Sequence, residues 1–124
     1  MNHIAFFEIQ SSNPARDVKF YKSAFGWKFA REKSLPIEYY RIETPGIMGG
    51  LLRRPVPPPG PAGTNAFTCS IQVKDFDATA KKLMKAGAQV AMAKFALPGR
   101  AWHGYFLDPD HNVCGIFQVD KRAT

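Results

Sequence analysis

The chain carries two copies of one pattern, and this repeat constrains the fold more than any other feature of the sequence. Residues 4–30 and 66–91 each contain an alternating apolar run, a turn signal, an amphipathic run that ends at a glycine, and a second apolar run. From Phe6 to Gly26 is 20 positions, and from Thr68 to Gly87 is 19, so the copies align without large gaps. Self-similarity of this kind predicts a chain built from two similar modules.

Each copy contains the signals of a strand followed by a helix. The alternating apolar run predicts a half-buried strand. Asn13 and Asp75 suit the N-cap of the following helix, and Pro14 suits its first position. Gly26 and Gly87 stand where a left-handed residue would end each helix. The predicted apolar stripes of the two helices are Val18, Tyr21, Ala24 and Phe25, and Phe76, Ala80, Leu83 and Met84.

Further strands are predicted at 39–42 and 47–52 in the first copy, and at 105–107 and 113–117 in the second. Each copy is therefore a βαβββ module, and a ferredoxin-like βαββαβ chain, with one strand fewer after each helix, ranks second. We expect one domain over 1–124, with modules at 1–53 and 65–120. The proline-rich segment 54–64 reads as a stiff linker between them.

Several local motifs resemble a known family. They are Phe20-Tyr21, Phe25-Gly26-Trp27, Val73-Lys74-Asp75 and the run 106–112. Together they resemble the glyoxalase/bleomycin-resistance/dioxygenase group, the vicinal oxygen chelate superfamily, over almost the whole chain. The resemblance implies an α+β fold in which two βαβββ modules form curved mixed sheets around a cleft. That superfamily includes isomerases, dioxygenases, epimerases, thiol transferases and drug-binding proteins, so the fold alone does not select a function.

The resemblance also implies where a divalent metal would be held. The four ligand positions would fall at Phe6, at Thr68, at Gly115 and within 49–51. Phenylalanine and glycine have no side-chain lone pair and threonine is a poor neutral ligand, whereas such ions prefer imidazole nitrogen or carboxylate oxygen. We therefore expect no metal and no other cofactor. The histidines are His3, His103 and His111; none is expected to be a ligand, although His103, placed just before a strand, could reach the cavity.

Strand parity separates the residues that face the cavity from those under the helices. If Phe6 faces inward, so does Glu8, and Thr68, Ser70 and Gln72 do so in the second copy. Glu8 could act as a general base, or it could form a structural hydrogen bond or an ion pair with an arginine such as Arg41. The catalytic candidates are Glu8, Tyr40 and His103. The candidate ligand-binding residues are Phe6, Glu8, Trp27, Tyr40, Thr68, Trp102, Tyr105 and Phe117.

Composition limits the remaining possibilities. No apolar run approaches the roughly 20 residues of a membrane span, so no membrane partner is expected. Cys69 and Cys114 lie in predicted strands and read as small buried residues in a reducing compartment, which favours a cytoplasmic protein. The formal charge of +7 is dispersed over helix surfaces and the tail, so nucleic-acid binding is not expected, while a mildly anionic ligand fits.

Three functions remain open. The first is a metal-independent protein that binds a small aromatic or anionic molecule in the sheet cavity. The second is a lyase, isomerase or dioxygenase-type enzyme with a metal-free or non-standard site. The third is a protein-interaction module with a vestigial cavity. Because relatives commonly pair, we also expect a homodimer.

Overall fold

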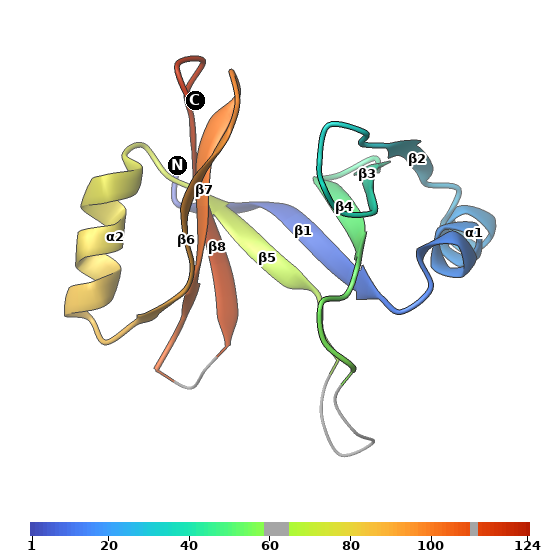
Figure 1. Ribbon diagram of the computed structural model, residues 1–124, viewed down its shortest axis with the longest axis horizontal. Helices are drawn as coiled ribbons and strands as arrows, with labels where there is room; N and C mark the ends of the chain where they lie inside the picture. Colours follow the sequence, from blue (N-terminus) through green and yellow to red (C-terminus); the bar gives the residue numbers. More distant parts are fainter. Residues whose placement is uncertain (59–64, 110–111) are drawn as a thin grey trace. The chain divides into compact units, whose positions relative to one another are not determined.

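The structure is a computed structural model that describes residues 1–58, 65–109 and 112–124. Its elements follow the order strand, helix, three strands, twice over (Figure 1). They are β1 (His3–Ser11), α1 (Pro14–Phe25), β2 (Lys28–Arg31), β3 (Tyr39–Glu43), β4 (Met48–Arg53), β5 (Thr68–Gln72), α2 (Phe76–Lys85), β6 (Gln89–Leu97), β7 (Ala101–Leu107) and β8 (Val113–Val119). The two predicted βαβββ modules are confirmed, and the ferredoxin-like alternative is wrong.

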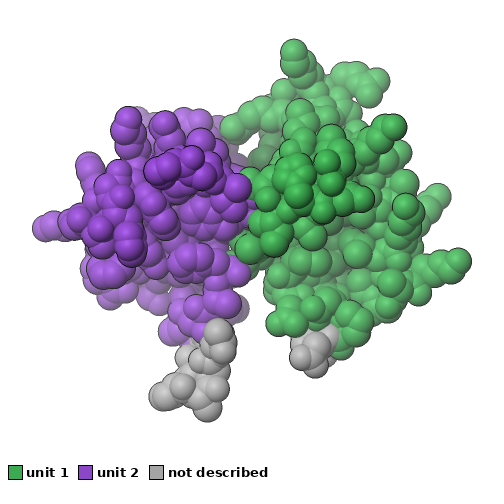
Figure 2. All heavy atoms as spheres, turned by 180° about the vertical axis from the view of Figure 1, so that it is seen from behind, with its two compact units in different colours: residues 1–5, 68–124 green, residues 6–67 purple. Residues whose placement is uncertain are grey.

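The chain separates into two compact units, coloured in Figure 2. Unit 2 contains residues 6–67, and unit 1 contains residues 1–5 together with 68–124. The first residues belong with the second half because the backbone N–H of Asn2 donates to the carbonyl of Gln72 at 2.8 Å. Of the predicted linker 54–64, residues 59–64 lie outside the described part of the chain.

The strands of both units follow the same pairing scheme. In unit 2, β1 runs parallel to β4, and β2, β3 and β4 are antiparallel neighbours. In unit 1, β5 runs parallel to β8, and β6, β7 and β8 are antiparallel neighbours. The parallel register sets Glu8 against Gly50, and Ser70 against Gly115. The repeat in the sequence is therefore a repeat in strand pairing.

Both helices begin and end as their sequences predict. The side chains of Asn13 and Asp75 each accept a hydrogen bond from the backbone N–H three residues later, at 3.2 and 3.0 Å. Pro14 occupies the first helical turn, where its missing N–H leaves no bond unmade. Gly26 has φ of +72° and Gly87 has φ of +105°, a conformation that glycine adopts without strain.

Each helix covers one face of the strands in its own unit. In unit 2 the core under α1 is Phe7, Ile9, Ile42 and Leu51, with Val18 and Tyr21 packed against it. In unit 1 the core under α2 is Val73, Phe76, Phe106 and Ile116. Because side chains alternate along a strand, the residues between these positions point to the other face, which we call the distal face. Glu8 and Ser70 are on the distal faces of their units.

Several details differ from the sequence-based expectation. Ala24 and Met84, assigned to the apolar stripes of the two helices, are exposed. Phe25, assigned to the apolar stripe of α1, is 62% exposed because it lies in the last turn, where its ring contacts Tyr21 and Trp27 instead of the core. His103 does not precede a strand but lies in the middle of β7. Pairing of β6 with β7 begins at Leu97 and Ala101, and the polar His103 interrupts the apolar alternation that would have revealed this strand.

The states of the two cysteines and the character of the two helices can be compared with the sequence-based expectations. Cys69 and Cys114 are free thiols, but both are half-buried rather than buried, and burial raises the pKa of the Cys114 thiol, with Asp108 adding a smaller effect. Neither helix of the described residues has the length and apolar character that crossing a membrane requires.

Candidate functional site

In unit 2, a buried hydrogen bond joins two polar side chains on the distal face. The Tyr39 hydroxyl on β3 donates to Oε2 of Glu8 on β1 at 2.9 Å, and the two residues are 8% and 9% exposed. Gly50 on β4 stands between these strands, and the Tyr39 ring lies where a Cβ on Gly50 would be. A side chain at position 50 would therefore displace Tyr39 from Glu8.

Unit 1 contains a second pair built in the same way. Ser70 on β5 is fully buried and its Oγ lies 3.2 Å from Nε2 of His103 on β7. Gly115 on β8 stands between them, next to Ser70 in the register. A Cβ on Gly115 would overlap the Ser70 oxygen and come within 3.0 Å of the His103 nitrogen and of the Tyr105 ring.

The two pairs occupy equivalent positions in the repeat. In each unit the first strand supplies one polar partner, the last strand supplies a glycine, and the strand before it supplies the second partner. Tyr39 and His103 both lie two residues before the position that faces the glycine. The missing side chain creates the space that the pair fills, because protein interiors leave few voids.

His103 is surrounded by aromatic rings. The centroids of Phe95, Tyr105 and Phe117 lie 5.4, 4.8 and 5.7 Å from that of the imidazole, and the first two rings are stacked on it. Burial lowers the pKa of His103 from 6.5 to about 4, since the charged form loses its hydration. The imidazole is therefore neutral at neutral pH and is a base no stronger than an ordinary carboxylate.

The structure places the predicted site residues on both faces of the strands. Phe6, Glu8, Thr68, Tyr105 and Phe117 follow the distal parity of their strands. Phe6 also lines a recess of about 370 Å³ with Arg41 and Met48. In contrast, three predicted residues pack against the helix-side cores: Trp27, Tyr40 and Trp102. These three side chains are therefore on the helix-covered face, whereas the two polar pairs are on the distal face.

Sequence reasoning identified one member of each pair and missed the other. Tyr40 was one of three catalytic candidates, with Glu8 and His103, but its neighbour Tyr39 is the tyrosine that donates to Glu8. Arg41, expected as a partner of Glu8, lies 3.5 Å from Glu32. Ser70 was placed on the correct face, but its bond to His103 depends on the register of β5, β7 and β8, which no local pattern encodes. His111, in the predicted turn, lies outside the described residues.

Comparison with known proteins identifies the family. The family model for the glyoxalase/bleomycin resistance protein/dioxygenase superfamily matches residues 1–116. The chain belongs to this superfamily. It is 26% identical over 118 residues to "Putative glyoxylase CFP32" of Mycobacterium tuberculosis, a match that covers 93% of this chain and 45% of that protein. This chain thus spans a little under half the length of that mycobacterial relative.

Solved structures share the fold at low sequence identity. A variant of glyoxalase I from Zea mays matches with a TM-score of 0.70 and 21% identity, over 94% of this chain and 43% of the maize chain. A variant of methylmalonyl-CoA epimerase from Streptomyces coelicolor, in complex with 2-nitronate-propionyl-CoA, matches with a TM-score of 0.69 and 12% identity, over 100% and 99% of the two chains. These likenesses establish a common fold.

The lowered pKa of His103 predicts how stability depends on pH. The unfolded chain binds a proton at this residue near pH 6.5 and the folded chain only near pH 4, so acidification across this interval favours unfolding. Each unit of pKa difference is worth about 1.4 kcal/mol. When the pH is lowered from 6.5 to about 4, the free energy of unfolding should therefore fall less for His103→Gln than for the parent chain. Urea unfolding at several pH values measures both changes. Equal losses in both proteins would contradict the assignment.

The close approach at Gly50 predicts a large effect from a single methyl group. Gly50→Ala should destabilise the protein by about 1–3 kcal/mol, because the added Cβ displaces the Tyr39 ring and breaks its bond to Glu8. Gly46→Ala is the matched control, since its Cβ would meet only Thr44 Oγ1 at 3.9 Å. Urea unfolding measures both changes. Similar stabilities of the two variants would show that the space over Gly50 is not filled as described.

Proposed function

We propose that this member of the glyoxalase superfamily is a binding protein that holds a small aromatic or anionic molecule on the distal face of its strands, without a metal at the positions where relatives hold one. The proposal rests chiefly on one observation. At Gly50 and Gly115 the space for a side chain is already taken, by Tyr39 in one unit and by Ser70 with His103 in the other.

The side chains present do not suit the divalent site that the superfamily resemblance implies. A carboxylate at position 50 or 115 would overlap a neighbouring side chain. Phe6 and Thr68, at the other two positions, offer no strong ligand. No group of three or more histidine, cysteine, aspartate or glutamate residues within the described ranges could hold an ion. Glu8 accepts a hydrogen bond from Tyr39, and the His103 nitrogen is engaged with Ser70.

The aromatic residues around His103 supply a surface for a planar molecule. Tyr105 and Phe117 are only half-buried, and they flank the buried Ser70–His103 pair on one face of unit 1. Ring stacking contributes about 0.5–1.5 kcal/mol per pair beyond burial. A mostly apolar site with a few polar groups is the usual composition of a small-molecule site. The net charge of +7 favours a ligand that carries negative charge.

A panel of aromatic acids and coenzyme A esters tests this proposal. The coenzyme A esters are included because the similar epimerase structure holds 2-nitronate-propionyl-CoA. We expect at least one compound to raise the melting temperature and the rise to persist in EDTA. Tyr105→Ala should weaken binding by about tenfold, the effect of removing one good aromatic contact. Phe25→Ala is the control, because Phe25 is 62% exposed on α1. Stoichiometric metal in protein purified without added metal, or binding abolished by EDTA, would overturn the proposal.

A metal-free enzyme is the second candidate, and the Glu8–Tyr39 pair favours it. A carboxylate and a phenol at 2.9 Å can serve as proton acceptor and proton donor in an isomerase or lyase reaction. Incubation of a bound ligand with the protein in D₂O, followed by NMR, would reveal exchange of a carbon-bound hydrogen. A binding protein gives no exchange. Exchange that Glu8→Gln slows by about 100-fold or more, with ligand affinity retained, would establish the enzyme instead.

A further inference from the structure

Unit 2 contains a cavity on the helix-covered side of its strands, away from the Glu8–Tyr39 pair. It lies beside the start of α1 and has a volume of about 480 Å³, within the range of small-molecule pockets. The end of β1, the first two turns of α1 and the segments that follow β4 contribute to its walls. The residues that line the cavity include Ser11, Arg16, Asp17, Tyr21, Arg54 and Phe67.

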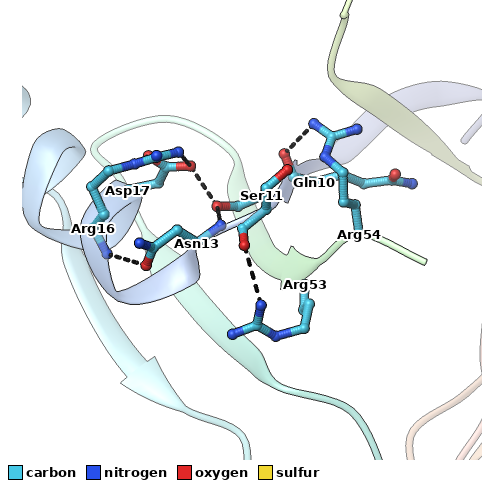
Figure 3. Close-up of polar contacts among 8 residues, drawn as sticks. Gln10, Ser11, Asn13, Arg16, Asp17, Arg53 and Arg54 are labelled. Atoms are coloured by element: carbon cyan, nitrogen blue, oxygen red, sulfur yellow. Dashed lines mark hydrogen bonds and ion pairs between the residues drawn. The ribbon is translucent and has the colours of Figure 1, made fainter. Parts of the chain in front are cut away.

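Arg54 lines this cavity, and its side chain carries a buried donor for which no described residue supplies an acceptor. Its Nη2 donates to the carbonyl of Gln10 at 3.0 Å (Figure 3). The same nitrogen donates to Oδ1 of Asn65 at 3.3 Å, and the two bonds hold the guanidinium in place. Its Nε is buried, and no described residue accepts a hydrogen bond from it. Buried donors in native proteins are nearly always paired, so this nitrogen points to a ligand acceptor.

The charges around the cavity leave room for one negative charge. Arg16 is neutralised locally by Asp17, whose carboxylate lies 2.9 Å away and also accepts a hydrogen bond from Ser11 (Figure 3). The hydrogen bond from Arg16 is the largest cause of the lowered pKa of Asp17, which keeps this carboxylate ionised. Arg54 is then the cation in excess. A monoanion matches this balance, whereas a dianion would be repelled by Asp17.

Aromatic rings line the rest of the cavity. Phe20 and Phe67 are 58% and 47% exposed although both are large and apolar. Two of the lining rings are held by stacking on other aromatic side chains. The Tyr21 ring is stacked on Trp27 with the centroids 5.4 Å apart, and the Phe67 ring is stacked on Phe7 with the centroids 6.0 Å apart. Rigid, partly exposed rings bind a flat ligand with little loss of side-chain freedom.

We infer that this cavity binds a small aromatic carboxylate, with the ring against Phe20, Tyr21 and Phe67 and the carboxylate on the Nε side of Arg54. This site is independent of the proposed distal-face ligand, because the two sites share no residue. The carboxylate satisfies the unpaired donor, and the ring covers the exposed aromatic surface.

Three probes separate the contributions of charge and ring. 2-Naphthoate carries both, 2-naphthylmethanol carries the ring alone, and acetate carries the carboxylate charge alone. We expect 2-naphthoate to shift the NMR signals of residues that line the cavity, and the other two probes to bind at least about tenfold more weakly, since a hydrogen bond to a charged group is lost in one case and the ring contacts in the other. Equal affinity of the acid and the alcohol would overturn the inference.

Neighbouring arginines provide matched variants. Arg54→Gln should weaken 2-naphthoate binding by about tenfold or more. Arg53→Gln should leave it unchanged, because Arg53 pairs with Glu38 at 2.8 Å and does not line the cavity. Arg16→Gln, at a side chain that is 65% exposed, should also weaken binding, because Asp17 then loses its counter-charge. Equal losses for Arg54→Gln and Arg53→Gln when both variants unfold at the parent's urea concentration, or an unchanged affinity for Arg16→Gln, would overturn the inference.

Discussion

Parallel pairing between the first and last strands of each module determines where the other features of the molecule lie. It aligns Glu8 with Gly50 in one unit and Ser70 with Gly115 in the other. A glycine beside a buried polar residue leaves a space that a side chain from the next strand must fill, since a void would forfeit dispersion contacts. Tyr39 and His103 fill these spaces and hydrogen-bond the polar residues they meet.

The two pairs show how a repeated backbone can carry different chemistry. In unit 2 the space is filled by a phenol that donates to a carboxylate, and in unit 1 by a neutral imidazole beside a hydroxyl. Burial among rings keeps the imidazole uncharged, because the charged form would lose its hydration. The superfamily fold is thus retained while the spaces beside Gly50 and Gly115 are filled by hydrogen-bonded side chains that exclude a longer residue at these two positions.

Much of the fold was predictable because its signals are local. Asn13 and Asp75 cap their helices as expected, and Gly26 adopts the left-handed conformation that ends α1. The site was less predictable, because it depends on contacts between distant segments. Tyr39 and Tyr40 are indistinguishable in composition, and only the register of β3 against β4 decides which of them reaches the distal face. Trp102, by its parity on β7, and Trp27, just before β2, pack against the helix-side cores, although their size suggested a ligand site.

The amino-acid sequence by itself determined the repeat, the order of strands and helices and the helix ends, because each is encoded by periodicity or by residues with restricted backbone conformations. The superfamily was indicated by the resemblance of local motifs to those of known members. Only the tertiary structure decided that Glu8 meets Tyr39, that Ser70 meets His103, and that Arg54, which carries a buried nitrogen, lines a cavity beside α1. These contacts join residues that are 31, 33 and up to 44 positions apart along the chain. Such contacts arise from strand register and packing, which no short segment specifies.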